Sequence, residues 1–297
     1  NELINQNMRT RKLILLAALL AFLASCSNSP RDIELQYANT KESVLNYELS
    51  YMQDSKAEMN GEPMNAEYHV NIPYEMSITQ KGTQVESSIH IKNPEVKFII
   101  AGGQQVVDTR NLKNLEIGFT HTPFGYQKEI ILIDSLQIDF GAMLGGTLDW
   151  EYLFTYITPG LPGKKSNIGD TWNETIAVNR IEAGSKITAD LELKHELTGF
   201  DKFNGRKCAV IESEISAILN DSYSMMDASW NLKGTLSGNM TWYFDYEQGI
   251  IIQLLIEERS EGSVVAPEIG INATYSQNSI ISQIKLTTAC GSSGPSG

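Results

Sequence analysis

Strict alternation of apolar and polar residues constrains the fold of this chain more than any other feature. The clearest runs cover residues 45–51, 68–78, 187–193, 242–246 and 250–256. In each run an apolar side chain stands at every second position. A period of two sends successive side chains to opposite faces of a strand, so one face of the sheet packs on a core and the other meets water. The pattern predicts antiparallel strands in both halves of the chain.

Turn sequences suited to positive φ separate these runs. They are Asn60-Gly61, Lys81-Gly82, Gly102-Gly103, Asn204-Gly205 and Gln248-Gly249, and such pairs are typical of tight hairpins. Pro73 falls on the polar side of its run, which indicates an edge strand, a bulge or a break there. We therefore predict a mainly β protein with roughly ten to twelve strands, arranged as a large curved antiparallel sheet or open half-barrel.

Two stretches lack this alternation. Met143–Ile157 is apolar nearly throughout and ends at a Pro/Gly-rich stop, so we predict one buried helix packed on the concave face of the sheet. Its side chains Trp150, Phe154 and Ile157 are either core or candidate contacts for an apolar ligand. The stretch Asp221–Trp230 is interpreted as a short helix or a mobile loop.

The amino-terminal residues have the pattern of a secretory signal. Basic residues lead into twelve apolar residues, Leu13 to Ala24, and the sequence Ser25-Cys26 follows. The apolar run spans about 18 Å as a helix, too short for a bilayer core of about 30 Å. Its Leu-Ala-Ser-Cys ending resembles the bacterial lipoprotein box. That resemblance implies cleavage between Ser25 and Cys26 and lipidation of Cys26, which would hold the protein on a membrane by several acyl chains, palmitate among them.

Localisation follows from the residues around the cysteine. Ser27, not an acidic residue, follows Cys26, which resembles outer-membrane sorting of bacterial lipoproteins and implies a periplasm-facing protein in the cell envelope. The predicted organisation is a signal peptide with an upstream extension (1–25), a lipidated tether (26–34), a single β-rich domain (35–289) and a flexible tail (290–297). Within the domain, two halves, 35–160 and 168–289, flank a connector.

Charge and motifs exclude several functions. The chain has 23 basic and 36 acidic residues, and beyond residue 25 its net charge is near −15, so we expect no nucleic-acid partner. The four histidines lie in separate segments without metal-ligand spacing. No nucleophile motif or phosphate-binding glycine loop is present. We expect no cofactor and no enzymatic activity.

The second half carries a more specific likeness. The turn Ile168-Gly169-Asp170-Thr171-Trp172 and the stretch Gly238–Gly249 resemble an uncharacterised family of Bacteroidota-type lipoproteins. The resemblance implies a sheet like that of the periplasmic lipoprotein carriers, without an established activity. From the residues themselves, Gly169 offers a positive φ, Asp170 can bond the turn's backbone and Trp172 can plug the sheet.

With Cys26 lipidated, Cys208 and Cys290 remain. In an oxidising compartment they could form a disulfide that closes a loop of roughly 80 residues, worth about 4–5 kcal/mol. Two functions stay open for the chain as a whole. It either binds an apolar or lipid-like ligand in its curved sheet, or it is a structural lipoprotein with a packed interior that docks on another envelope protein.

Overall fold

The computed structural model describes residues 32–37, 44–100, 103–107, 109–110, 115–126, 129–133, 137–139, 147–149, 157–182, 185–225 and 228–286. Its strands are β1 (Ile33–Glu34), β2 (Leu45–Met59), β3 (Glu62–Lys81), β4 (Gln84–Ile91), β5 (Glu95–Ile100), β6 (Gly103–Val106), β7 (Glu116–His121), β8 (Glu129–Ile133), β9 (Gln137–Asp139), β10 (Thr147–Asp149), β11 (Lys165–Ser166), β12 (Thr171–Glu182), β13 (Ser185–Phe203), β14 (Arg206–Met225), β15 (Ala228–Asp245), β16 (Ile250–Ala266) and β17 (Ile271–Lys285). Within these ranges no helix is long and apolar enough to cross a membrane.

One large sheet contains most of these strands. Its order is β12-β13-β14-β15-β16-β17-β2-β3-β4-β7-β8, with β5 pairing β3 and β6 pairing β5. All pairings are antiparallel, and in the described residues β12 and β8 form its two ends without closing it into a barrel. The predicted mainly β, curved antiparallel sheet is therefore confirmed. The seventeen strands exceed the ten to twelve predicted, because several are pieces of two to six residues.

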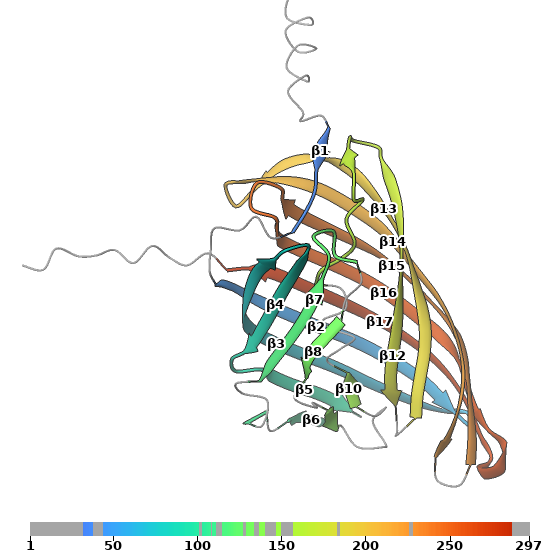
Figure 1. Cartoon of the computed structure of the whole chain (residues 1–297). Coiled ribbons are helices and arrows are strands. Elements are labelled where there is room, and N and C mark those ends of the chain that lie inside the picture. Colours follow the sequence, from blue (N-terminus) through green and yellow to red (C-terminus); the bar gives the residue numbers. More distant parts are fainter. Residues whose placement is uncertain are drawn as a thin grey trace, which may run out of the picture.

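The two predicted halves share this sheet. β17, the last strand, pairs with β2 from Ala273↔Met59 to Lys285↔Tyr47, so the ends of the domain are joined along fifteen-residue strands. Figure 1 shows the sheet bent round, with β3, β4 and β7 in front of the long strands β15 to β17. The pairing of β17 with β2 therefore places the N-terminal and C-terminal halves in one sheet around one core.

Two hairpins confirm the turn predictions in detail. Asn60 (φ 53°) and Gly61 (φ 86°) connect β2 to β3, and Asn204 (φ 50°) and Gly205 (φ 78°) connect β13 to β14. Two central residues with positive φ define the type I′ turn, whose twist matches that of the flanking strands. These turns set the register of two of the longest hairpins.

Pro73 marks a break between partner strands. One edge of β3 pairs with β5 through residues 66–71 and with β4 through residues 74–81. Pro73, which has no N–H, lies between them, and its carbonyl oxygen accepts a hydrogen bond of 2.9 Å from the Lys92 nitrogen. Strand β3 itself continues through Pro73, which pairs with Glu48 of β2, so the interruption lies between its partners β4 and β5 and not in the strand that carries the proline.

The helix predicted over Met143–Ile157 is wrong where the structure describes it. Thr147–Asp149 form strand β10, which pairs antiparallel with β9, and Ile157 lies in a turn. Residues 143–146 and 150–156 lie outside the described residues. The error has a physical cause: a short apolar run without alternation has the composition of both a buried helix and a buried strand, and periodicity alone does not separate them.

The helix or loop predicted over Asp221–Trp230 is also wrong. β14 continues to Met225 and β15 begins at Ala228, and the pairs run from Met225↔Ala228 to Asp221↔Leu232. The stretch is the tip of a hairpin, whose register includes Tyr223↔Trp230. Pairing between two strands is a long-range effect that the local composition does not reveal.

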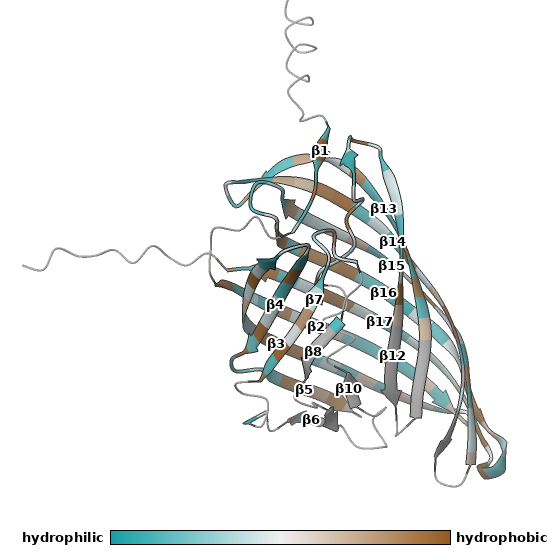
Figure 2. Cartoon of the chain, in the orientation of Figure 1, coloured by the Kyte–Doolittle hydropathy of each residue, from teal (hydrophilic) through white to brown (hydrophobic). Residues whose placement is uncertain are grey.

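Alternation gives the large sheet a buried inner face and a wet outer face. The bulkiest fully buried side chains, Trp242, Tyr47, Tyr74 and Phe244, belong to the inner face, and Figure 2 shows hydrophobic and hydrophilic residues following one another along the long strands. Tyr37 packs edge-on against Phe244 of β15 and against His121 of β7, each at 5.4 Å between ring centroids. The inner faces of the two ends of the sheet therefore meet across one core.

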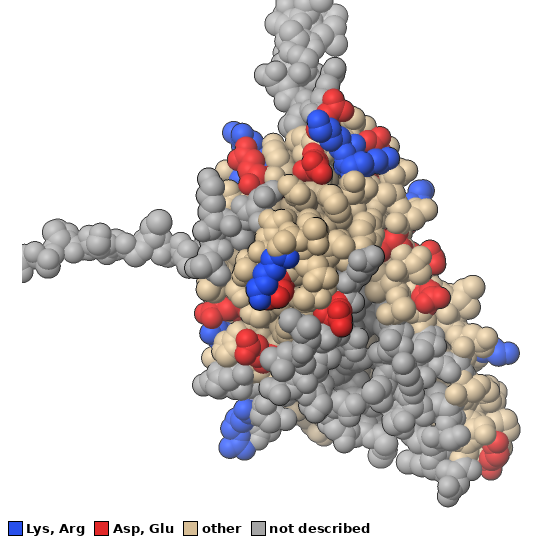
Figure 3. All heavy atoms as spheres, viewed as in Figure 1, with Lys and Arg blue, Asp and Glu red and all other residues tan. Residues whose placement is uncertain are grey.

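The outer face carries most of the charge. Exposed ion pairs such as Lys92–Glu75 (2.7 Å) and Arg259–Glu261 (2.9 Å) lie on it. On the face seen in Figure 3, Lys and Arg side chains are interspersed with Asp and Glu rather than gathered into a field of one sign. Exposed pairs of this kind contribute little to stability, on the order of 0–1 kcal/mol each, so the inner face determines the fold.

Candidate functional site

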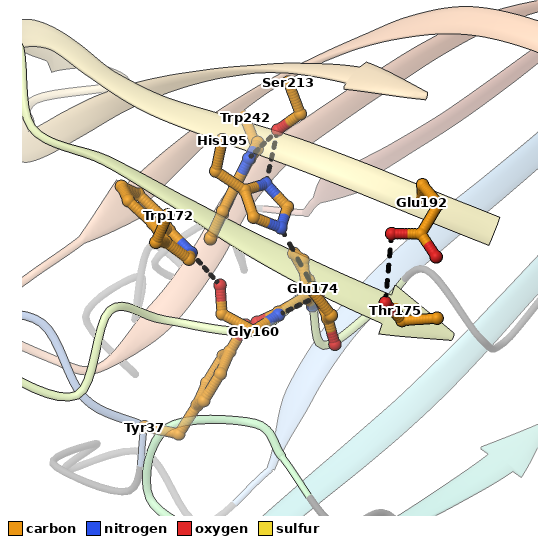
Figure 4. A network of polar contacts seen from close by, with 10 residues as sticks. Tyr37, Gly160, Trp172, Glu174, Thr175, Glu192, His195, Ser213 and Trp242 are labelled. Carbon is orange, nitrogen blue, oxygen red and sulfur yellow. Dashed lines mark hydrogen bonds and ion pairs between the residues drawn. The ribbon is translucent and has the colours of Figure 1, made fainter. Parts of the chain in front are cut away.

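A histidine without solvent exposure lies on the inner face near the β12 end of the sheet. His195 of β13 is 0% exposed and pairs with Trp172 of β12 and Ser213 of β14. Its ring stacks on that of Trp172 at 5.2 Å and meets the ring of Trp242 edge-on at 6.0 Å. We call Trp172, Glu174, His195, Ser213 and Trp242 the His195 cluster (Figure 4).

The chemistry of its members fixes the direction of one hydrogen bond in the His195 cluster. Trp242 Nε1 donates to Ser213 Oγ at 3.3 Å, and Ser213 Oγ lies 2.6 Å from His195 Nδ1. His195 Nε2 faces Glu174 Oε2 at 3.4 Å. An indole only donates and a carboxylate only accepts. Within the described part of the chain His195 Nε2 makes no hydrogen bond, and the direction of the bond between Ser213 and His195 Nδ1 follows from the tautomer of the imidazole.

Glu174 also holds the loop of residues 157–164 that precedes β11, which we call the connector. Its Oε2 accepts a hydrogen bond of 2.6 Å from the Gly160 nitrogen, while the Gly160 carbonyl accepts one of 2.8 Å from Trp172 Nε1. A Cβ atom at Gly160 would lie 2.6 Å from the Tyr126 ring and 2.9 Å from the Glu174 carboxylate. A larger residue would therefore displace one of these groups. The N–H and the C=O of Gly160, which belong to two successive peptide groups, hold the connector against β12.

Two tyrosines next to the connector have raised pKa values because they lie in the same enclosed environment. Tyr37 donates from its hydroxyl to the Pro159 carbonyl at 2.8 Å. Burial, and then the negative charge of Glu174, raise the pKa of Tyr37 well above its usual value. The same two causes raise the pKa of Tyr126 to about 12. Both effects follow because a buried phenolate beside a carboxylate is costly.

Ser213, His195 and Glu174 lie next to one another in that order. Hydrolases with a nucleophilic serine use the same order of serine, histidine and carboxylate. Here, however, Ser213 is only 4% exposed and His195 is 0% exposed, and Ser213 Oγ is already engaged by Trp242. The Gly160 N–H is committed to Glu174. The His195 cluster therefore joins four strands, β12 to β15, to the connector. Among the described residues no group of His, Cys, Asp and Glu is arranged to hold a metal ion.

A second region of the inner face lies beyond the packed core, toward the tips of the long hairpins. We call it the distal inner face, and it comprises the inner positions of β14 (Ala217, Leu219), β15 (Leu232 to Gly238), β16 (Glu258 to Val264), β17 (Tyr275 to Ser279) and β2 (Gln53 to Ala57). Several of its apolar side chains, including Leu219, Leu236 and Val264, remain half-buried. Inward-pointing apolar side chains that keep solvent exposure can still bury surface on a ligand.

The residues singled out in the sequence fall into two groups. Cys26, Ser25, Trp150, Phe154 and Cys290 lie outside the described residues, so lipidation, cleavage and disulfide pairing stay predictions. Ile157 is 2% exposed and belongs to the core cluster.

Cys208 and the Gly169 turn are described in full. Cys208 is a buried free thiol, and burial raises its pKa to about 11. Gly169 has φ 89°, and Asp170 Oδ2 accepts a 2.8 Å bond from the Asn167 nitrogen. The structural roles predicted for Gly169 and Asp170 are therefore confirmed, and Trp172 is a partly buried side chain that packs against the core.

The His195 cluster and the distal inner face were not predicted from the sequence. Each member of the cluster stands at an inner position of its strand, and a polar residue at an inner position was the available signal. What the sequence lacks is the register that places His195 beside Trp172 and Ser213, because pairing between strands depends on turns and core packing along the whole sheet.

Comparisons with known proteins give no family. No protein-family model and no curated protein matches the chain. One solved structure, described as showing lipid-protein interactions in lipovitellin, has a TM-score of 0.40 and 12% identity, over 89% of this chain and 27% of that one. A DUF1329 family protein from Desulfovibrio piger has a TM-score of 0.17 and 11% identity, over 85% of this chain and 89% of that one. At such scores neither likeness says what this chain binds, and the resemblance to Bacteroidota-type lipoproteins stays a prediction.

Proposed function

We propose that this protein is a non-catalytic lipoprotein of the bacterial cell envelope, anchored through Cys26 to the outer membrane, that binds an apolar or lipid-like ligand on the distal inner face. The anchor rests on the Ser25-Cys26 sequence. The ligand rests on the inner face, where the apolar surface continues past the packed core.

A single contrast carries the ligand proposal. Leu236 of β15 and Val264 of β16 point inward, next to the core, yet keep partial exposure. The outer positions of the same strands are dominated by polar residues such as Lys233, Glu257 and Arg259. Burying one leucine side chain completely is worth about 1.5–3 kcal/mol, so a few such contacts are enough to hold a lipid tail.

The non-catalytic part of the proposal is supported by the closed His195 cluster. A nucleophile must approach the reacting carbon to about 3 Å, and the hydroxyl of Ser213 is enclosed by the sheet and the connector. The same burial explains the cluster as a structural junction.

Native mass spectrometry of the mature protein, extracted from its own membrane, tests ligand binding. We expect a co-purified apolar mass. Leu236→Asn should reduce its occupancy about tenfold, because one partly buried leucine contact is lost. Leu255→Asn is the matched control, since Leu255 lies on the outer face of the neighbouring strand and is 37% exposed. Equal retention by both variants, with unchanged circular dichroism, would contradict the proposal.

Membrane fractionation tests the anchor separately. Cys26→Ser should give a soluble or unprocessed protein that incorporates no labelled palmitate, whereas the wild type appears in the outer-membrane fraction. Equal palmitate incorporation in wild type and variant would refute lipidation at Cys26.

The alternative, a docking lipoprotein, is favoured by one observation. On the outer face Met52 pairs with Ile280 across β2 and β17, and these residues, with Leu255 and Ile284, are 37–42% exposed. The Leu236 and Leu255 variants separate the two functions. A ligand carrier is impaired by the inner substitution, and a docking protein with a packed interior is impaired by the outer one.

A further inference from the structure

Six polar residues form a contiguous block in the middle of the distal inner face. Gln53, Ser279 and Glu258 occupy one row across β2, β17 and β16, and Ser55, Gln277 and Ser260 occupy the next row. We call these six residues the polar block. It interrupts an inner face that is apolar toward the core, where the preceding row contains Tyr51, Ile281 and Ile256.

The composition of the polar block differs from that of the solvated face. Outer positions on β2 and β16 beside the block carry charges: Asp54 and Lys56, and Glu257 and Arg259. Five of the six residues in the block are instead uncharged amides or hydroxyls. The outer positions of β17 between them, Ser276 and Asn278, are uncharged. On β2 and β16 the two faces therefore differ, with charges outside and neutral donors and acceptors inside, which suits the recognition of an uncharged polar group.

Part of its hydrogen-bonding capacity is used internally, and part is not. Tyr51 donates from its hydroxyl to Gln53 Oε1, Gln53 Nε2 donates to Ser55 Oγ at 2.6 Å, and Ser279 Oγ donates to Glu258 Oε2 at 3.3 Å. Across the part of the chain that the structure describes, the side chains of Gln277 and Ser260 make no hydrogen bond. Gln277 keeps partial exposure, so its two donors and its carbonyl oxygen are available to a ligand.

The aromatic side chain of Tyr275 lies in the row next to the polar block. Tyr275 pairs with Gly262, which pairs with Gly234. A Cβ atom at Gly234 would lie 2.6 Å from the Tyr275 hydroxyl oxygen, and one at Gly262 would lie 2.9 Å from it. The Tyr275 side chain therefore extends from β17 over β16 to β15, and the two glycines leave room for its hydroxyl group. Tyr275 keeps partial exposure, so it offers an aromatic surface beside the hydrogen-bonding groups.

We propose that the polar block and Tyr275 bind an uncharged, hydroxyl-rich head group, a sugar or polyol, of the ligand. This inference rests on the proposed function and specifies its ligand. Alternating hydroxyl groups match the donors and acceptors of Gln277, Gln53 and Ser55, which keep partial exposure. Glu258 and Ser260 are only 5% and 9% exposed, and the carboxylate of Glu258 disfavours an anionic head group. The less polar face of the head group rests on Tyr275, and the alkyl chain continues along Leu236 and Val264.

Amphiphiles with one tail and different heads test the head-group class. Octyl glucoside, octyl sulfate and octyltrimethylammonium, each below its micelle concentration, are titrated calorimetrically into the wild-type protein, with free glucose as a fourth probe. We expect octyl glucoside to bind at least tenfold more tightly than the other two amphiphiles. Binding of glucose alone at similar affinity would assign the site to a free sugar, whereas dependence on the octyl tail assigns it to a glycolipid.

A matched pair of variants tests the residues. Gln277→Met keeps the length of the side chain but removes its donors, and should weaken octyl glucoside binding about three- to tenfold, as loss of one or two hydrogen bonds does. Gln253→Met is the control, because Gln253 of β16 lies outside the polar block and keeps partial exposure. Octyl sulfate binding should change in neither variant.

Each other outcome overturns a specific claim. Equal affinities for the three amphiphiles would refute head-group recognition and leave the apolar ligand site intact. Preference for octyltrimethylammonium would show that Glu258 selects a cation and would refute the sugar assignment. No binding of any octyl amphiphile would refute the proposed ligand function together with this inference.

Discussion

Gly160→Ala tests whether the connector is held by the contacts described above. The added Cβ would stand 2.6 Å from the Tyr126 ring and 2.9 Å from both Cδ and Oε2 of Glu174. Carbon contacts below 3.0 Å do not occur, so either the ring or the carboxylate must move. The carboxylate holds the Gly160 nitrogen at 2.6 Å and faces His195 at 3.4 Å, so displacing it weakens both interactions.

The expected magnitude follows from two contributions. Overpacking at a buried site costs about 1–3 kcal/mol, and weakening a hydrogen bond to a charged group costs about 1.5–3 kcal/mol. Partial relaxation makes these contributions overlap, and we expect the free energy of unfolding to fall by about 2–4 kcal/mol. For a domain of this size that corresponds to a fall in Tm of about 4–16 °C.

Chemical denaturation followed by tryptophan fluorescence measures the effect. Gly199→Ala is the control: a Cβ there meets no atom within 4 Å, so we expect no loss and a gain of up to about 1 kcal/mol from the reduced entropy of the unfolded chain. Glu174→Gln combined with Gly160→Ala completes a double-mutant cycle, in which the effects should be less than additive because both act through one carboxylate. If Gly160→Ala is as stable as Gly199→Ala, the assigned contacts at the connector are wrong.

Two other predictions concern titratable groups. Tyr37, Tyr74 and Tyr126 have folded-state pKa values above the ordinary value, so stability should be fully present below about pH 10 and fall as the pH rises from about 10 toward 12, where unfolding releases phenolic protons. Denaturation midpoints and phenolate absorbance measured from pH 8 to 11.5 check this, and a flat profile would count against it. Cys208, buried and with a pKa raised to about 11, should resist iodoacetamide at pH 8 in the folded protein and react in denaturant. A Cys208 peptide linked to a Cys290 peptide would instead establish the predicted disulfide.

The fold class was readable from the sequence because strand periodicity is local. Alternation at residues 45–51 or 250–256 needs no knowledge of the partner strand, since any half-buried strand shows it. The Asn60-Gly61 and Asn204-Gly205 turns were predictable for the same reason: their φ angles are positive, which few other pairs tolerate. The errors arose where local signals are ambiguous, as at Thr147–Asp149, whose apolar surroundings suit a helix and a strand equally well.

Tertiary structure alone decided which side chains meet. The sequence determined the alternation within the strands, as in residues 187–193 just before His195 and residues 250–256. It did not determine that β17 pairs with β2, which brings Gln277 beside Ser55, or that the connector places Gly160 on Glu174. Those contacts join residues more than a hundred positions apart or in separate elements. They depend on the register of many strands at once, and a shift of one residue would send each of these side chains to the opposite face.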